Sequence, residues 1–260
     1  MRTSLLLLLA LLLAGGAVAQ PGLQAVPGKT YAPGAFDSLY FTGTATVRFL
    51  QGERDEVFVE GDQAVQDAVE IELEGKRLVV RNSGSWKFWR GPQQRTRMVV
   101  VARDLRSLKV SGAANFLAPE GVQVSQLQVD ISGSAVARFD KLSTDRLVFA
   151  VSGAGDGHFT GQALTVVVSI SGKGDFYGAD LEAQQAKVNI SGLGKARLWV
   201  HKTLDANISG IGTVEYFGAP VVHKKSTGVG RYTERGPHPR TAALPPLAPA
   251  LPVPAFPPAP

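Results

Sequence analysis

Hydrophobic and polar positions alternate along most of the chain, and turn residues separate the alternating runs. A clear example is segment 69–74, which reads Val-Glu-Ile-Glu-Leu-Glu and is followed by Gly75-Lys76. Period-two alternation bounded by glycine or aspartate is typical of β-strands. We therefore expect residues 31–107 to form an N-terminal region of β-strands, with at most one helical turn at 63–69.

From residue 108 to residue 232 the alternation repeats every 18 to 21 residues. Each repeat has alternating apolar residues, then Val or Ile, a Ser-Gly pair, and Gly or Ala two positions later. Strand-rich repeats of about 20 residues predict a β-solenoid in which each repeat is one coil. Helical repeats would show a 3.6-residue period, and a propeller blade needs about twice this length. The pairs are Ser111-Gly112, Ser132-Gly133, Ser152-Gly153, Ser171-Gly172, Ser191-Gly192 and Ser209-Gly210.

Solenoid coils stack about 4.8 Å apart, so equivalent positions line up as ladders. The Val or Ile before each serine should form an internal aliphatic ladder, and the serine hydroxyls should be able to hydrogen-bond from coil to coil. The glycines should allow a corner that needs unusual φ/ψ angles or close backbone approach. The predicted fold class is all-β: a parallel β-helix or β-solenoid, preceded by an N-terminal β-strand region that caps or extends it.

Both ends of the chain differ from the repeats. Residues 1–19 have the pattern of a signal peptide, with Arg2, a leucine-rich core and small residues at 17–19. The apolar run is shorter than the ~20 residues of a membrane span, so we expect cleavage rather than anchoring. We interpret residues 20–30 as a linker and 233–260 as a proline-rich, extended or disordered tail. The expected location is the periplasm, the cell surface or the medium.

The amino-acid composition and net charge exclude several kinds of binding partner and binding site. The chain has no cysteine and a formal net charge of +5. An exported chain without cysteine has no disulfide framework and no thiolate metal site. The positive charge is not gathered into the dense basic stripe of a nucleic-acid-binding protein, so no nucleic-acid partner is expected. After the leader no stretch is apolar enough to cross a bilayer, so we expect no transmembrane segment in the mature chain.

One segment, residues 82–96, breaks the alternation and stands out chemically. It holds two of the three tryptophans, with several cations and no acidic residue. Aromatic side chains in a basic loop can stack on sugar rings, insert at a membrane interface or anchor a protein partner. The alternative, which the sequence favours equally, is a hydrophobic plug over the end of the solenoid. The candidate binding residues are Trp86, Lys87, Phe88, Trp89, Arg90, Arg95 and Arg97.

Catalysis and metal binding have weaker support. A glycan-active β-helix enzyme would need clustered carboxylates, but short and uniform coils leave few long loops to build a cleft. The Gly-x-Gly-Asp motifs at 153–156 and 172–175 are similar to calcium-binding nonapeptide coils, yet they lie 19 residues apart rather than about nine. We interpret these aspartates as turn residues and expect no catalytic residue, no cofactor and no metal. The candidate carboxylates are Asp130, Asp156, Asp175 and Asp180.

The order of these features resembles the GIN head domain family, an adhesin-labelled family of exported bacterial proteins whose function is unknown. The resemblance rests on Phe-Asp-Ser-Leu at 36–39, on Leu-Arg-Ser-Leu-Lys-Val-Ser-Gly at 105–112, and on the Ile-Ser-Gly-x-Gly coils. It covers about residues 31–232. The resemblance implies a β-helix-like fold and export, and it brings no catalytic residues.

The sequence therefore predicts an exported, non-catalytic binding or adhesion module of the bacterial cell envelope. Its partner would be an envelope glycan or protein, contacted by the 86–97 loop and one face of the solenoid. Two alternatives remain open. One is a glycan-active enzyme of the β-helix type, similar to polysaccharide lyases or hydrolases. The other is a purely structural scaffold that forms homo-oligomers.

Overall fold

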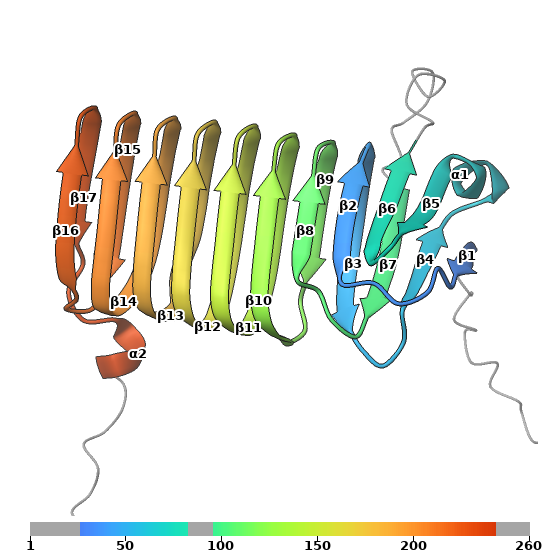
Figure 1. The fold of residues 1–260 in the computed structure, drawn as a ribbon, viewed down its shortest axis with the longest axis horizontal. Coiled ribbons are helices and arrows are strands. Elements are labelled where there is room, and N and C mark those ends of the chain that lie inside the picture. Colours follow the sequence, from blue (N-terminus) through green and yellow to red (C-terminus); the bar gives the residue numbers. More distant parts are fainter. Residues whose placement is uncertain (1–26, 83–95, 243–260) are drawn as a thin grey trace, which may run out of the picture.

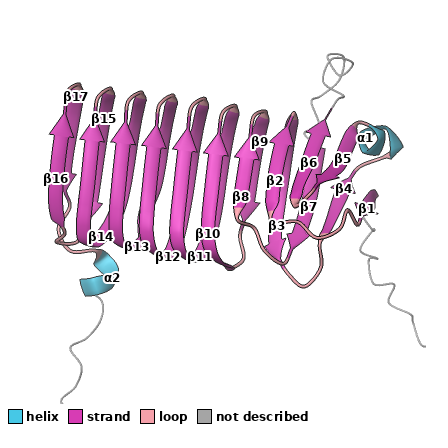
Figure 2. Ribbon diagram, in the orientation of Figure 1, coloured by secondary structure: helices cyan, strands magenta, loops and turns pink. Residues whose placement is uncertain are grey.

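The strands wind into a parallel β-solenoid (Figure 1). A computed structural model describes residues 27–82 and 96–242, and these two ranges contain 17 strands. Two short helices, α1 (Gln63–Asp67) and α2 (Pro239–Ala242), lie at opposite ends of the stack (Figure 2). The fold class predicted from the repeats is confirmed.

Each coil pairs a strand that runs into a Ser-Gly turn with a strand that leaves it on the opposite face. We call the strands that run into the turns sheet I and those that leave them sheet II. Sheet I contains β8 and β10, sheet II contains β9, and β11 to β14 each begin in sheet II and bend round into sheet I. The bounds are β8 (Ser107–Val110), β9 (Ala113–Ala118), β10 (Val122–Ile131), β11 (Ser134–Val151), β12 (Ala154–Ile170), β13 (Lys173–Ile190), β14 (Leu193–Ile208), β15 (Ile211–Phe217), β16 (Val221–Ser226) and β17 (Val229–Glu234).

Parallel pairing between coils places equivalent residues side by side. Ile131, for example, pairs with Val110 on one side and Val151 on the other. The residues before the six serines pair in this way and are at most 1% exposed, which gives an aliphatic ladder inside the solenoid. Burial of such apolar surface is the main stabilising contribution in a chain without disulfides.

The corner after each serine is tight because successive backbones come close together. The N–H groups of Ser171 and Gly172 both donate to the carbonyl oxygen of Val151, at 2.8 and 3.2 Å. A Cβ at Gly172 would lie 2.0 Å from the carbonyl oxygen of Gly153. None of the six turn glycines has a positive φ, so glycine is needed here for close approach rather than for an unusual backbone angle.

A row of phenylalanines fills the core behind sheet II. Their rings stack from coil to coil with centroid separations of 5.3 to 5.9 Å, which suits offset aromatic packing. Each ring is at most 1% exposed. The members of this row, in spatial order, are Phe49, Phe116, Phe139, Phe159 and Phe176.

The N-terminal region adds coils to the stack in an order that differs from the sequence. One coil is β2 (Ser38–Thr42) with β3 (Thr44–Gln51), and the other is β6 (Arg77–Asn82) with β7 (Thr96–Ala102). β2 pairs in parallel with both β6 and β8, and β3 with both β7 and β9. The earlier coil in the sequence therefore lies between the later coil and the repeats.

Antiparallel strands then close this end. β5 (Val69–Glu74) pairs with β6, β4 (Glu56–Glu60) with β7, and β1 (Gly28–Tyr31) with β4. Reversing the strand direction ends the parallel stack and protects its edge. The N-terminal region therefore both extends and caps the solenoid.

The last coil, formed by β16 and β17, places polar side chains where earlier coils have apolar ones. Lys224 aligns with Ala206. Ser226 aligns with Ile208. The Lys224 ammonium lies 5.8 Å from the ring centroid of Tyr232, whose hydroxyl donates a hydrogen bond to the carbonyl oxygen of Lys225. This end is therefore closed by cation–π and hydrogen-bond contacts.

Beyond β17 the chain turns back over the lower corner of the stack, where α2 lies (Figure 1). The N–H of Arg235 donates to the carbonyl oxygen of Tyr216 at 2.8 Å, and the N–H of Gly218 donates to that of Gly236 at 2.9 Å. The His238 ring stacks on Trp199 with centroids 3.9 Å apart. Of the helices in the two described ranges, neither is long and apolar enough to cross a bilayer.

Candidate functional site

Most of the predicted aromatic loop lies outside the described residues. This applies to Trp86, Lys87, Phe88, Trp89, Arg90 and Arg95, and their binding role stays a prediction. Arg97 lies in β7, where its guanidinium pairs with the Glu60 carboxylate at 3.3 Å. Both side chains are solvent-accessible, so this pair contributes at most about 1 kcal/mol.

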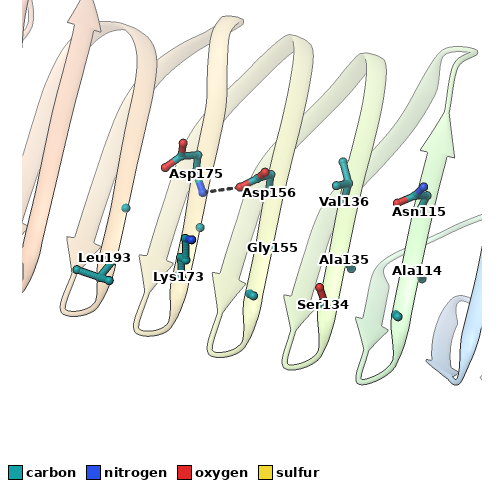
Figure 3. A pocket seen from close by; sticks show the side chains of 14 residues that line it. Ala114, Asn115, Ser134, Ala135, Val136, Gly155, Asp156, Lys173, Asp175 and Leu193 are labelled. Atoms are coloured by element: carbon teal, nitrogen blue, oxygen red, sulfur yellow. Dashed lines mark hydrogen bonds between the residues drawn. The ribbon is translucent and has the colours of Figure 1, made fainter.

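A shallow groove of about 550 Å³ crosses the outside of sheet II just beyond the Ser-Gly turns (Figure 3). We call it the outer groove. The first residues of β9 and of β11 to β14 line it, so it spans five coils. With about 4.8 Å between coils, it is about 20 Å long. Such a groove can hold an extended chain better than a compact small molecule.

Small residues form the floor of the outer groove. In the five coils these are Ala114, Ala135, Gly155, Gly174 and Gly194. A Cβ at Gly174 would lie 2.0 Å from the carbonyl oxygen of Gly155, so the coils approach too closely for a side chain there. A Cβ at Gly155 would also lie 2.9 Å from the Ile131 side chain in the core, so these positions face the solenoid interior and the floor of the groove is backbone rather than side chains.

Asp156 and Asp175 lie side by side at the groove, one coil apart (Figure 3). Asp156 Oδ1 accepts a hydrogen bond from the N–H of Asp175 at 2.9 Å. Asp175 Oδ1 accepts one from the N–H of Lys195 at 2.8 Å. The carboxylates therefore connect strands of successive coils. Within the described ranges no group of three or more His, Cys, Asp or Glu side chains is placed to hold a metal ion.

A row of side chains in register, with stacked rings at its centre, runs along sheet II beside the groove, one from each of four coils: Arg138, His158, Tyr177 and Arg197. We call it the stacked row. The rings of His158 and Tyr177 have centroids 4.4 Å apart and lie 11° from parallel. The Arg197 guanidinium carbon lies 5.5 Å from the Tyr177 centroid. Because neighbours stand on both faces of Tyr177, a ligand can reach only the edge of this ring.

The environment of the stacked row changes how its members ionise. Burial lowers the pKa of His158, so its imidazole is neutral at pH values where a free histidine begins to protonate. Burial and the hydrogen bond that the Tyr177 hydroxyl donates to Asp175 raise the pKa of Tyr177. The centre of the row is therefore uncharged at neutral pH.

The row continues to Glu215 in β15, which three cations surround. Its carboxylate lies 2.6 Å from Lys195 Nζ, 3.0 Å from Arg235 Nη2 and 3.3 Å from Arg197 Nε. Burial by itself would raise the pKa of Glu215, but the hydrogen bonds from Lys195 and Arg235 outweigh it and the pKa is lowered. Three cations around one carboxylate give this part of sheet II a net positive charge.

Three exposed aliphatic side chains form a line at the C-terminal end of the groove. Leu193 pairs with Ile211, and Ile211 pairs with Val229, so the three are neighbours on successive coils. They are 49%, 57% and 71% exposed. We call this line the aliphatic ridge.

The carboxylates that an enzyme would need are dispersed over the molecule. Asp130 lies on sheet I, where it accepts a hydrogen bond from Gln128 at 2.8 Å. Asp180 pairs with Arg240 at 3.1 Å near the C-terminal end. Asp156 and Asp175 lie on sheet II and bind backbone N–H groups. These four candidates therefore do not converge on one cleft.

The fold and the outer groove define a β-solenoid that presents a long, continuous strand surface to its surroundings. The chain belongs to the family described as "Putative auto-transporter adhesin, head GIN domain", which matches residues 35–220. The resemblance drawn from the sequence is thereby confirmed. No curated protein matches the chain. Membership in an adhesin family points to an exported or surface protein.

Solved structures from Bacteroides fragilis and Parabacteroides distasonis have the same architecture. A "putative adhesin" of Bacteroides fragilis has a TM-score of 0.75 and 17% identity, over 81% of this chain and 97% of that one. A "putative adhesin" of Parabacteroides distasonis has a TM-score of 0.62 and 21% identity, over 80% and 96%. A "putative lipid binding protein" of Parabacteroides distasonis has a TM-score of 0.61 and 19% identity, over 80% and 96%. At these identities the likeness concerns the fold alone.

Proposed function

We propose that the protein is an exported, non-catalytic binding module of the bacterial cell envelope. It contacts an envelope glycan or protein through sheet II, and the 86–97 loop adds to the contact. The observation that carries this proposal is the outer groove, a channel about 20 Å long that spans five coils.

The chemistry around the groove supports binding rather than turnover. The groove offers backbone and carboxylate groups for hydrogen bonds, and it lies beside the cations around Glu215. These groups are already fixed by contacts between coils, so little side-chain entropy is lost when a ligand binds. The adhesin description of the family agrees with a binding role.

The direct test is a binding screen of the full chain against envelope glycans and envelope proteins, with one variant that fills the groove. Ala154→Trp adds a bulky side chain at an exposed position in the middle of the groove. Lys187→Trp makes a comparable change on sheet I. We expect Ala154→Trp to weaken binding about tenfold or more and Lys187→Trp to leave it unchanged.

Other outcomes separate the alternatives. Binding that survives Ala154→Trp but disappears in a Trp86→Ala/Trp89→Ala variant would move the contact to the loop. Release of reducing ends or unsaturated sugars would make the protein an enzyme. Absence of any ligand together with concentration-dependent assembly would favour the scaffold.

A further inference from the structure

The aliphatic ridge is the feature that the proposed function leaves unexplained. Exposed apolar residues are ordinary when scattered, but an aligned set indicates a contact surface. Three of the six large hydrophobic side chains that are most exposed in the described ranges belong to this one line. The ridge shares only Leu193 with the outer groove, so it needs its own partner.

The ridge has the shape of a straight edge. Leu193, Ile211 and Val229 each follow directly after a turn, and the turns form one edge of the solenoid (Figure 1). Parallel register keeps the three side chains about 4.8 Å apart along this edge. A convex, linear edge fits against a flat partner better than into a pocket.

Unpaired cations surround the ridge. Lys173 precedes Leu193 in the same ladder, and Arg231 lies two residues after Val229 on the same side of β17. Lys225 lies at the end of β16, just before the turn that leads to Val229. In the described part of the chain, none of these three side chains forms an ion pair, although 17 ion-pair contacts occur elsewhere. The partner should therefore carry negative charge.

We propose that this edge docks on an anionic lipid surface, with the aliphatic ridge inserted between the headgroups and Lys173, Lys225 and Arg231 contacting them. A flat surface that is apolar inside and negatively charged outside matches the ridge in shape and in chemistry. A second copy of the chain fits less well, because two-fold pairing along the edge would bring like charges together. This inference goes beyond the proposed function and does not depend on the outer groove.

The test is flotation of the full chain with vesicles of phosphatidylcholine, with and without about one third phosphatidylglycerol. We expect binding to the anionic vesicles only, and weaker binding as salt is raised. Ile211→Ser/Val229→Ser should lower the partition coefficient about tenfold, and Lys225→Glu/Arg231→Glu should lower it at least as much. All four positions are exposed, so the fold should be unaffected.

Matched controls come from positions far from the Ser-Gly turns, at or near the bend where the strands enter sheet I. Leu164 is 56% exposed, and Arg146 is an exposed cation on the adjacent strand. Leu164→Ser and Arg146→Glu should bind anionic vesicles as the unmodified chain does. Because the chain has no cysteine, Val229→Cys and Leu164→Cys can each carry one environment-sensitive dye. We expect an emission shift with anionic vesicles for the dye at residue 229 only.

Three results would overturn the proposal: no binding to anionic vesicles, equal loss in the ridge variants and in the Leu164→Ser and Arg146→Glu controls, or no emission shift at residue 229. Concentration-dependent self-association that Ile211→Ser/Val229→Ser abolishes, without vesicle binding, would assign the ridge to a second copy. Loss of glycan binding in Ala154→Trp with vesicle binding intact would show that the two surfaces act independently.

Discussion

At the Ser-Gly turns, the position of one backbone oxygen decides which residue the chain can use. The sequence shows that glycine recurs, but it is compatible with two reasons, an unusual φ or a close approach. The structure shows that close approach is the reason, because the Cβ of any other residue at position 172 would overlap the carbonyl oxygen of Gly153. Periodicity alone could not distinguish them, since it reports which residues recur and not how closely successive backbones lie.

Gly172→Ala should therefore be strongly destabilising. The coils would have to separate to accommodate the methyl group, and we expect a loss of about 3 kcal/mol or more in the free energy of unfolding. Urea denaturation measures this loss. Gly121→Ala is the matched control, because a Cβ there would have its nearest neighbour at 3.8 Å, and we expect a change below about 1 kcal/mol. Equal effects of the two substitutions would contradict the account.

At the scale of elements, the sequence identified strands and faces better than their neighbours in space. Alternation assigns each residue to the inside or the outside, and a regular period predicts which coil follows which. The N-terminal coils break that order, since β2 and β3 lie between the β6–β7 coil and the repeats. The hydrophobic alternation could not predict this spatial order of the coils, because any parallel strand with an apolar face is an acceptable neighbour.

The stacked row was missed for a related reason. His158, Tyr177 and Arg197 lie 19 and 20 residues apart, so no local motif contains two of them. Aligning the repeats on their Ser-Gly pairs puts all three at the same position. That alignment was available in the sequence, but the contact between the rings depends on the register between coils.

We expect the stability of the segment after β17 to depend on pH. His238 is 5% exposed and faces Asp180, Glu182 and Arg240, and burial lowers its pKa despite the nearby carboxylates. Its pKa in the folded chain is therefore below the value of about 6.5 in the unfolded chain. The unfolded chain binds more protons in the interval between these values, so this contribution to stability is present above about pH 6.5 and is lost as the pH falls through that interval.

Hydrogen exchange at the amide of Gly218, which donates to the Gly236 carbonyl, should therefore become several-fold faster between about pH 7 and pH 5, after correction for intrinsic rates. His238→Phe retains a ring against Trp199 and removes the titrating group. That variant should lose most of the acceleration. An equal acceleration in the variant would show that His238 does not control this segment.

At the scale of the whole molecule, the ends of the stack determine whether the chain remains single. Antiparallel strands close the N-terminal end, and at the other end the exposed Lys224 and Ser226 align with the core residues of the preceding coil. A solenoid with an apolar final coil would offer its edge to another copy. Lys224→Ala/Ser226→Ile restores the residue types of the preceding coil, Ala206 and Ile208.

We expect this double variant to associate in a concentration-dependent way that the unmodified chain does not show at the same concentration. Light scattering coupled to gel filtration measures the mass. Lys187→Ala, a lysine substitution away from the ends, is the control. A double variant whose mass equals that of the unmodified chain at every concentration would argue against a protective role for the polar coil.

The claim that sheet II is the binding face is tested most directly by hydroxyl-radical footprinting of the chain on isolated cell envelopes. Val136 and Tyr177 report on sheet II, His223 reports on sheet I, and Leu164 reports on the bend where the strands pass from sheet II into sheet I. We predict that Val136 and Tyr177 become protected on the envelope while Leu164 and His223 react as they do in solution. Equal protection of both sheets, or protection of sheet I alone, would contradict the account.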